Sequence, residues 1–287
     1  MESADYAPFR RGSYSTRAGV TLFRIAISKR LLLATLGALA AARCLAQQPF
    51  ATDDAEVTEK GHWHFQYANE YDFLHEVAYP HERQNTNNFV IQYGLFGSVE
   101  VNMDFPLIVL RNAPASGTSS AFGLGDVDFA VKWKMVEEAP DGARPAFTVN
   151  AAVEFPTGSE SKELGSGVTD VVVNTIFQKT FSGTQLHFNA GIQFTGNTAT
   201  GAVGIHTPGR IVIGGLSAAR DFSERLRLGL DLNGAEVFDG GQVEKQLQLT
   251  AGGNYALTKN DTLDFAVIVG WYNAPRVGFV LGVSITP

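Results

Sequence analysis

The chain has 287 residues, of which 45% are apolar and 18% are charged, and its formal net charge at pH 7 is −7. The 30 glycines and 20 phenylalanines favour a β-rich protein with many turns, and they exclude a disordered chain, which needs high charge and few aromatic residues. The acidic balance disfavours nucleic acid as a partner, because phosphates attract Lys and Arg.

The first 46 residues predict an N-terminal extension followed by a signal peptide. Two basic residues at 29–30 precede an apolar run at 31–42, and small residues lead to an expected cleavage after Ala46. The apolar run is too short for a membrane-spanning helix, which needs about 20 residues. We therefore expect the chain to be exported and residues 47–287 to form the folded domain.

An alternating pattern begins in the stretch GHWHFQYANEYDF at residues 61–73. Most odd positions carry aromatic side chains, such as Trp63 and Tyr67, and most even positions carry polar ones, such as His64 and Gln66. A period of two places these two sets on opposite faces of a β-strand. The same period recurs, with varying regularity, in eleven further segments: 87–95, 99–105, 126–135, 146–155, 169–179, 185–194, 210–221, 225–233, 246–255, 262–271 and 276–285.

These candidate strands predict a barrel rather than a packed soluble sheet. Most have about ten residues, the length of a tilted membrane strand, whereas soluble strands commonly have about five or six. The links between them mostly alternate between long and short, as in outer-membrane barrels with short periplasmic turns and longer outer loops. Every backbone polar group in lipid must be paired, so among sheets only a closed ring is compatible with a membrane.

Alternation alone does not decide which face meets lipid, because a soluble barrel or sandwich with an apolar interior has the same period. Aromatic residues near the strand ends favour interfacial girdles. The polar face is rich in Gln, Asn and Thr, where a solvated exterior usually carries more Lys and Glu. We predict an all-β fold: a transmembrane antiparallel β-barrel of about 12 strands in the bacterial outer membrane. Its expected partners are lipid, the barrel-assembly machinery and a small-molecule solute.

Three stretches follow one another in the predicted barrel: YGLFGSVEV at 93–101, GLGDVDFAVKW at 123–133 and VEFPTGSESKELGSGVTD at 153–170. They resemble the outer-membrane proteins grouped under the MetA-pathway of phenol degradation. The resemblance covers most of the mature chain, and it implies a barrel that passes small, often aromatic, hydrophobic compounds across the outer membrane. One departure is the C-terminus, because the chain ends in SITP where many such barrels end on an aromatic residue.

Charged residues and one histidine on the predicted polar face are the candidate lumen-lining residues. They come from most of the predicted strands: Glu70, Glu100, Asp104, Asp126, Asp128, Lys132, Glu154, His187, Arg227 and Asp231. Two compatible hypotheses remain open for the charged groups. They form a pairing network that braces the barrel, since a buried charge needs a partner, or they line a water-filled path whose acidic surplus favours cations.

No catalytic, cofactor or metal site is predicted. The GLGDVD motif at 123–128 lacks the third glycine and the following helix of a dinucleotide-binding fingerprint. His62 and His64 have a spacing that can hold a metal, but further ligands are not evident. We expect a passive channel or uptake protein rather than an enzyme. The alternatives are a structural or binding barrel with a plugged lumen and, third, a lipid-modifying enzyme that uses His187.

Overall fold

The structure is a computed structural model that describes residues 49–75, 81–112, 120–140, 143–194, 210–237 and 245–287. The predicted extension and signal peptide lie outside these ranges, so they stay predictions. The chain divides into two units, and the second, Leu45–Pro287, holds every element described below.

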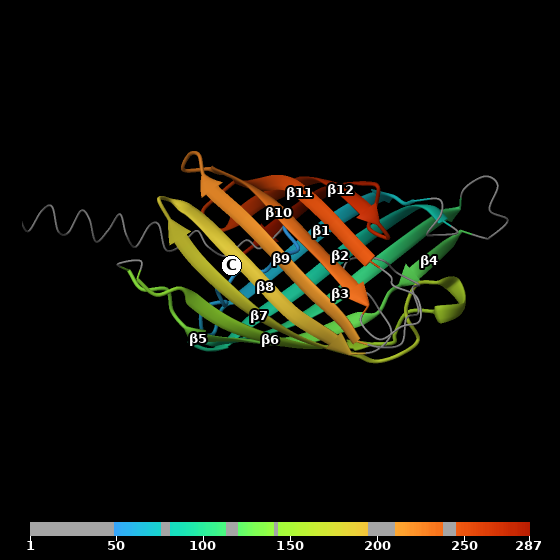
Figure 1. Ribbon diagram of the computed structural model, residues 1–287, viewed down its shortest axis with the longest axis horizontal. Coiled ribbons are helices and arrows are strands. Elements are labelled where there is room, and N and C mark those ends of the chain that lie inside the picture. The colour runs from blue at the N-terminus through green and yellow to red at the C-terminus, as the bar shows by residue number, and fades with distance from the viewer. Residues whose placement is uncertain (1–48, 76–80, 113–119, 141–142, 195–209, 238–244) are drawn as a thin grey trace, which may run out of the picture. The chain divides into compact units, whose positions relative to one another are not determined.

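Thirteen β-strands and one 3-10 helix form the regular structure of the described residues (Figure 1). In chain order they are β1 (Trp63–Phe73), β2 (His81–Phe96), β3 (Val99–Asn112), β4 (Ala121–Leu124), β5 (Val127–Val136), β6 (Ala146–Phe155), η1 (Glu160–Lys162), β7 (Asp170–Phe181), β8 (Thr184–Phe194), β9 (Arg210–Asp221), β10 (Leu226–Val237), β11 (Lys245–Ala256), β12 (Asp261–Tyr272) and β13 (Val277–Ile285). In this part of the chain, no helix has the length and apolar character needed to cross a membrane.

The strands form a closed antiparallel ring. With β4 set aside, consecutive strands of the chain pair with each other, and β4 is a short addition beside β3. The first and last strands close the ring, with β1 and β13 paired from Phe65↔Ile285 to Phe73↔Val277. The ring therefore contains all strands but β4, and the prediction of an antiparallel barrel of about 12 strands is confirmed.

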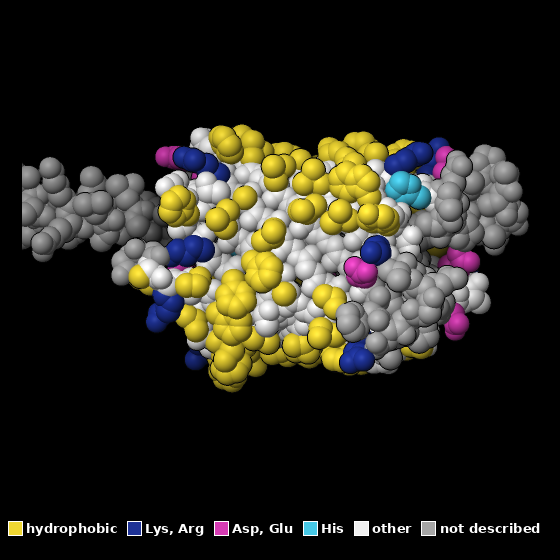
Figure 2. All heavy atoms as spheres, in the orientation of Figure 1, with side chains coloured by type: hydrophobic (Ala, Val, Ile, Leu, Met, Phe, Trp, Pro, Cys, Tyr) yellow, Lys and Arg dark blue, Asp and Glu magenta, His cyan; other side chains and the backbone are white. Residues whose placement is uncertain are grey.

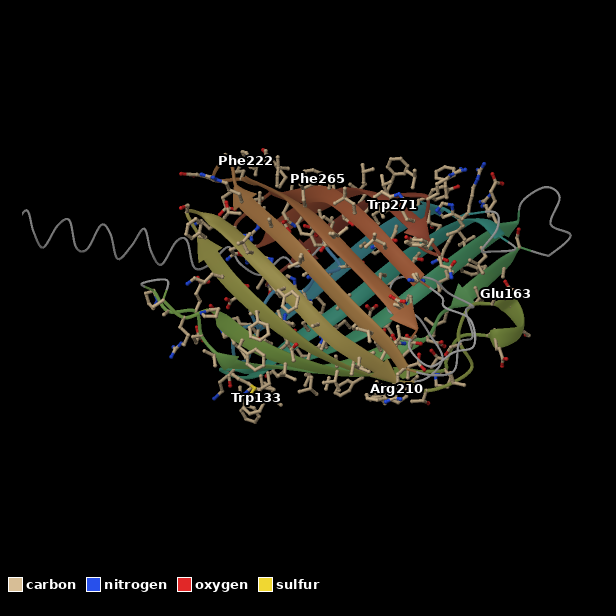
Figure 3. All side chains as sticks on the ribbon, in the orientation of Figure 1. Trp133, Glu163, Arg210, Phe222, Phe265 and Trp271 are labelled. Atoms are coloured by element: carbon tan, nitrogen blue, oxygen red, sulfur yellow. The ribbon has the colours of Figure 1, made fainter. Side chains whose placement is uncertain are left out.

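The two faces of the barrel wall differ in character. On β1, Trp63 is 47% exposed whereas the adjacent His64 is 2% exposed, and this alternation recurs along the other strands. Figure 2 shows hydrophobic side chains spread over the outer surface and charged side chains gathered toward its two ends. Trp133 and Trp271 point away from the ribbon in Figure 3. An apolar outer band on a closed sheet is the arrangement that lipid requires.

Links of different length lie at the two ends of the ring. At one end, here called the turn end, the strands are joined by residues 97–98, 137–145, 182–183, 222–225 and 257–260. At the other, the loop end, the joining residues are 74–80, 113–126 (including β4), 156–169, 195–209, 238–244 and 273–276. The tightest turns need unusual backbone angles: Ser182 and Gly183 have φ values of 50° and 79°, as a two-residue hairpin turn requires.

Near the loop end the structure departs from the sequence prediction. The predicted strand ends at Phe105, but β3 continues to Asn112 and the unpredicted β4 pairs beside it. The alternation is lost because the inward positions there are apolar as well. Ile108 and Leu110 pack inside the barrel wall against Leu164 from the link 156–169.

Candidate functional site

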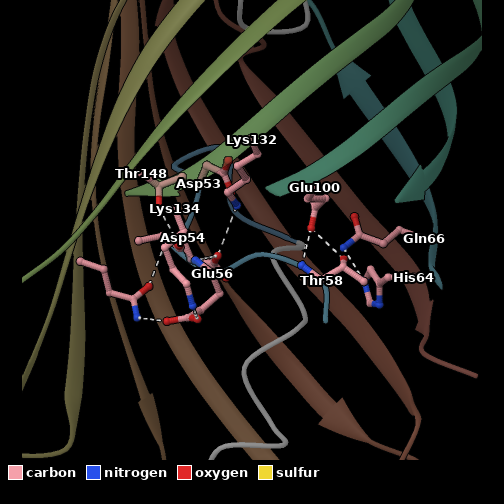
Figure 4. A network of polar contacts seen from close by, with 12 residues as sticks. Asp53, Asp54, Glu56, Thr58, His64, Gln66, Glu100, Lys132, Lys134 and Thr148 are labelled. Carbon is pink, nitrogen blue, oxygen red and sulfur yellow. Dashed lines mark hydrogen bonds and ion pairs between the residues drawn. The ribbon is translucent and has the colours of Figure 1, made fainter. Parts of the chain in front are cut away.

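The interior of the barrel contains a segment of the chain that precedes β1. Residues 50–60, here called the inner segment, contact β3, β5, β6, β7 and β10, which lie on different sides of the ring (Figure 4). Thr52, Ala55 and Thr58 are almost completely buried. The lumen is therefore occupied along part of its length by the protein itself.

The inner segment is held near its start by a carboxylate on β10. The backbone N–H groups of Ala51 and Thr52 donate to Oδ2 of Asp231 at 3.1 and 3.4 Å, and the Thr52 hydroxyl donates to Oδ1. Asn233 donates to the same carboxylate at 2.7 Å. Asp231 is fully buried, so these donors satisfy a charge that would otherwise be costly to desolvate.

Two lysines on β5 bind the acidic middle of the inner segment. Nζ of Lys132 lies 2.9 Å from Asp53 and 3.5 Å from Asp54. Nζ of Lys134 lies 3.0 Å from Glu56. Burial raises the pKa of the Asp53 carboxyl to about 6, and the Lys132 ammonium only partly offsets that effect.

Further hydrogen bonds complete the attachment. The Thr148 hydroxyl on β6 donates to the Ala55 carbonyl at 2.6 Å, and the Ala55 N–H donates to the Gln178 side chain on β7 at 3.1 Å. Both the N–H and the hydroxyl of Thr58 donate to Oε2 of Glu100 on β3, at 2.6 and 2.7 Å. The segment is thus bound by backbone and side-chain groups at both of its ends and in its middle.

Small residues on the wall make room for the inner segment. A side chain at Gly215 would overlap the Thr52 hydroxyl, and one at Gly229 would meet the Phe50 ring at 2.9 Å. Where the segment leaves the barrel, Lys60 pairs with Gly94 of β2 in parallel. Gly215 and Gly229 are explained by the close approach of side chains of the inner segment rather than by the need for an open path.

The predicted lumen-lining residues fall into separate groups; those on strands occupy inward-facing positions, and Asp126 lies in the link before β5. Glu100, Lys132 and Asp231 bind the inner segment. Glu70 and Asp72 lie on the same face of β1 near the loop end. Arg227 donates to Gln185 and lies 4.0 Å from Asp221. The other four acids gather near the loop end: Asp104, Asp126, Asp128 and Glu154. That these residues line a permeation path stays a prediction.

The sequence reasoning missed the partner of the lysines. It expected charges of the wall to pair with one another, whereas Lys132 and Lys134 pair with acids that precede β1. The available signal was the acid-rich stretch TDDAE at 52–56, placed between the expected cleavage point and the first strand. Inward-pointing lysines on a mid-barrel strand call for acidic partners, and this stretch supplies them.

The histidines do not assemble a catalytic or metal site in the described residues. Nδ1 of His187 lies 2.8 Å from the Ser217 hydroxyl, and Ser217 is directly opposite Asp231 on the next strand. The serine is therefore between the histidine and the acid, whereas a catalytic triad places histidine in the middle. His64 bonds to Gln66 and Thr286. Across the part of the chain described, no group of three or more His, Cys, Asp or Glu side chains could hold a metal ion.

Sequence comparison identifies one family. The model of the family described as "Putative MetA-pathway of phenol degradation" matches residues 47–282. No curated protein sequence matches the chain.

Solved structures with the same architecture are outer-membrane barrels. The COG4313 outer membrane channel from Pseudomonas putida F1 is similar with a TM-score of 0.62 and 14% identity, over 82% of this chain and 98% of that chain. The NanC porin has a TM-score of 0.53 and 8% identity, over 77% and 98%. The translocator domain of the autotransporter NalP from Neisseria meningitidis has a TM-score of 0.50 and 9% identity, over 91% and 97%. At these identities the likeness shows the fold.

Proposed function

The chain belongs to the family described as MetA-pathway of phenol degradation, and on that premise we propose that it is an uptake channel of the bacterial outer membrane. The predicted signal peptide directs its export. Small solutes, aromatic and hydrophobic compounds among them, cross it by passive diffusion. The protein performs no chemistry on them and needs no cofactor.

The observation that carries this proposal is the opposite character of the two faces of a closed ring. The outer face is apolar along the strands, and the inner face carries polar side chains such as Gln92, Asn189 and Thr250, all buried. A ring with a filled core would instead place its apolar side chains inside. A polar interior behind an apolar exterior supports a wet path across a membrane.

The inner segment determines what such a path can admit. A ring of this strand number has an interior between that of filled eight-stranded barrels and that of open porins with about 16 strands. The segment narrows the interior further, because it contacts strands on several sides of the ring. We therefore propose a narrow path for small solutes rather than a general pore. The similar structure from Pseudomonas putida F1 is an outer membrane channel, which supports the same function.

One observation favours a second function. The inner segment is bound through Asp231, Lys132 and Glu100 at the same time, as expected for a permanent plug. A permanently plugged barrel is a structural or solute-binding protein of the envelope rather than a channel.

Conductance separates the two functions. The full mature chain is folded into phospholipid vesicles and planar bilayers, and its folding is verified by heat-modifiable gel mobility. A channel gives small, discrete current steps, and phenol, used as a neutral aromatic probe, reduces them as its concentration rises. Folded protein that gives neither ion current nor solute uptake contradicts the channel function and supports the permanent plug.

A further inference from the structure

We propose that two arginines on the outer wall, at the loop end of the barrel, bind a phosphate group of a lipid in the outer leaflet of the membrane. The pair, here called the arginine pair, consists of Arg83 on β2 and Arg111 on β3. This inference goes beyond the proposed function. It rests on the membrane position of the barrel and does not depend on whether the lumen conducts.

The strand register places the two arginines side by side on the outer wall. Phe73 of β1 is directly opposite Arg83, and Arg83 is directly opposite Arg111. Directly opposite residues share a face of the sheet, and Phe73 lies an even number of positions after the outward-facing Trp63. Cβ atoms in such pairs are about 4.5–5.5 Å apart, and like charges there destabilise a sheet. An anion bound between the two guanidinium groups removes this repulsion.

The arginine pair lies where the apolar outer band ends. On β3 the outward positions before Arg111 carry Leu107 and Val109, and Phe122 of β4, directly opposite Val109, is 60% exposed. Arg111 follows Val109 by two residues, which is about 7 Å along a tilted strand. The polar headgroup layer on each side of a bilayer is about 5–8 Å thick. The arginine pair is therefore at the level of the lipid headgroups, on the side where outer-membrane barrels carry their longer loops.

The protein leaves both guanidinium groups incompletely satisfied. That of Arg83 lies over the Phe73 ring, 5.4 Å from its centroid, which holds it against the wall. It also lies beside Tyr71 and 3.6 Å from Glu82, but the Glu82 pair is partly exposed and contributes little. Its Nε has no hydrogen-bond partner in the described structure. Arg111 is exposed, and no ion pair joins it to another described residue.

The chemistry of the arginine pair and of the wall below it selects a phosphorylated lipid. A guanidinium group has its N–H donors in one plane and matches phosphate oxygens in a bidentate way. Below Arg111 the wall is apolar, at Val109 and Phe122, so acyl chains pack there while the phosphate reaches the pair. A free phosphate ion gains only the charge contact.

The wall below Arg83 is polar, but its polar groups bind one another. The outward-facing Asn85 accepts hydrogen bonds from Asn69 and Asn87 at 3.1 Å each, and it donates to Asn69 at 3.2 Å. These amides need no external partner. We therefore expect the acyl chains of the lipid on the β3 side of the pair, and its polar part on the β2 side.

Thermal unfolding of the whole barrel tests the proposal. The mature chain is refolded into a detergent that carries no phosphate, and lipid A, a phosphorylated glycolipid, is added. We expect a saturable rise of the unfolding midpoint, because a ligand of the folded state stabilises it. Lipid A stripped of its phosphate groups, and inorganic phosphate at the same concentration, should give no such rise.

Arg83→Gln/Arg111→Gln removes both positive charges. Without lipid its unfolding midpoint should be at or above that of the wild type, because the repulsion between the arginines is gone. Its affinity for lipid A, measured by calorimetry in mixed micelles, should fall at least about tenfold. If this double variant does not fold, Arg111→Gln is measured alone; its side chain is exposed, and the change should weaken binding.

Arg225→Gln is the matched control. Arg225 is also exposed, but it belongs to the turn-end link 222–225, at the other end of the ring. This variant should keep the full response to lipid A. Equal affinity for lipid A in the wild type and in the variants of the arginine pair overturns the proposal. So does a full wild-type response to inorganic phosphate or to lipid A without phosphate. Conductance is not measured here, so these results stay interpretable whether or not the barrel is a channel.

Discussion

Nζ of Lys132 on β5 lies 2.9 Å from Oδ1 of Asp53 in the inner segment, although 79 residues separate them in the sequence. The Lys132 side chain is 1% exposed. A buried ammonium of this kind needs an anionic partner, and here the partner comes from a segment that belongs to no strand. The pair therefore connects the barrel wall to the contents of its lumen.

Removing the charge of Lys132 should release the inner segment. In Lys132→Met, Asp53 and Asp54 lose their ammonium partner, and breaking a buried ion pair in this way costs about 3–5 kcal/mol. We expect faster hydrogen exchange in residues 50–60 and larger current steps in planar bilayers. Lys179→Met is the control. Nζ of Lys179 lies 3.5 Å from Oε1 of Glu138, which belongs to the turn-end link 137–145 and not to the inner segment. Unchanged exchange in residues 50–60 of Lys132→Met would show that the pair does not hold the segment.

Gly215 on β9 should be as important as Lys132 for holding the inner segment, because it makes room for the start of that segment. Gly215→Val places a side chain where the Thr52 hydroxyl now lies, so it should displace Thr52 from Asp231. Overpacking of this kind costs about 1–3 kcal/mol. Limited proteolysis of the folded barrel should then cut within residues 50–60. Gly214→Val, one residue away on the exposed face, should leave the cleavage pattern unchanged; equal cleavage in both variants would contradict the assignment.

Docking of the inner segment should strengthen as the pH falls. The pKa of Asp53 is raised to about 6 in the docked state from an ordinary value of 3.8, so the docked state binds the proton more tightly. The stabilisation from this group is fully present below the ordinary value and is lost as the pH rises through about 6. Lys132, Asp54 and Glu100 face this carboxyl and set the size of the effect.

We expect a change in docking free energy on the order of 2 kcal/mol between about pH 7.5 and about pH 4. Hydrogen exchange of residues 50–60, corrected for the intrinsic pH dependence of exchange, measures it. Asp53→Asn removes the titrating group and should reduce the pH dependence. Protection that increases with pH in the wild type, and not in Asp53→Asn, would mean that the sign is wrong.

The two faces of β1 should respond differently to the same substitution. Tyr67 is 38% exposed on the outer face, whereas the adjacent Gln66 is 6% exposed on the inner face. Tyr67→Arg near mid-strand should destabilise the barrel in lipid by about 2–4 kcal/mol, and Gln66→Arg should be tolerated much better. Folding yield in lipid vesicles, read from heat-modifiable gel mobility, measures both variants. Equal damage would contradict the lipid-facing position of Tyr67.

The strands were predictable because their pattern is local. In RLRLGLDLN at 225–233, leucines on the outward face alternate with other residues on the inward face. The structure has β10 at this place. The prediction missed the end of β3, where both faces are apolar, as at Ile108 and Leu110. There the sequence does not alternate between apolar and polar residues. The inward position of Asp104, Asp128 and Glu154 was predicted from the alternation. Their register was not predicted, since it depends on pairing between strands.

The inner segment was not predictable from a single sequence for a different reason. It has no periodic pattern, and its contacts depend on a barrel that must already be closed. Glu56, for example, binds Lys134 on β5 and Gln178 on β7. Nothing in the neighbourhood of Glu56 along the chain indicates that these two strands will surround it.

The position of the inner segment also constrains the order of events in folding. Thr52 precedes every strand, yet its N–H bonds to Asp231, 179 residues later in the chain. The inner segment, which precedes every strand in the chain, thus acquires its partners only after most of the sheet exists, and contacts of such long range form slowly. Because β1 pairs with β13, closure of the ring joins the beginning of the sheet to its end around this segment. The barrel encloses the segment that precedes its first strand, and this segment reaches its final place last.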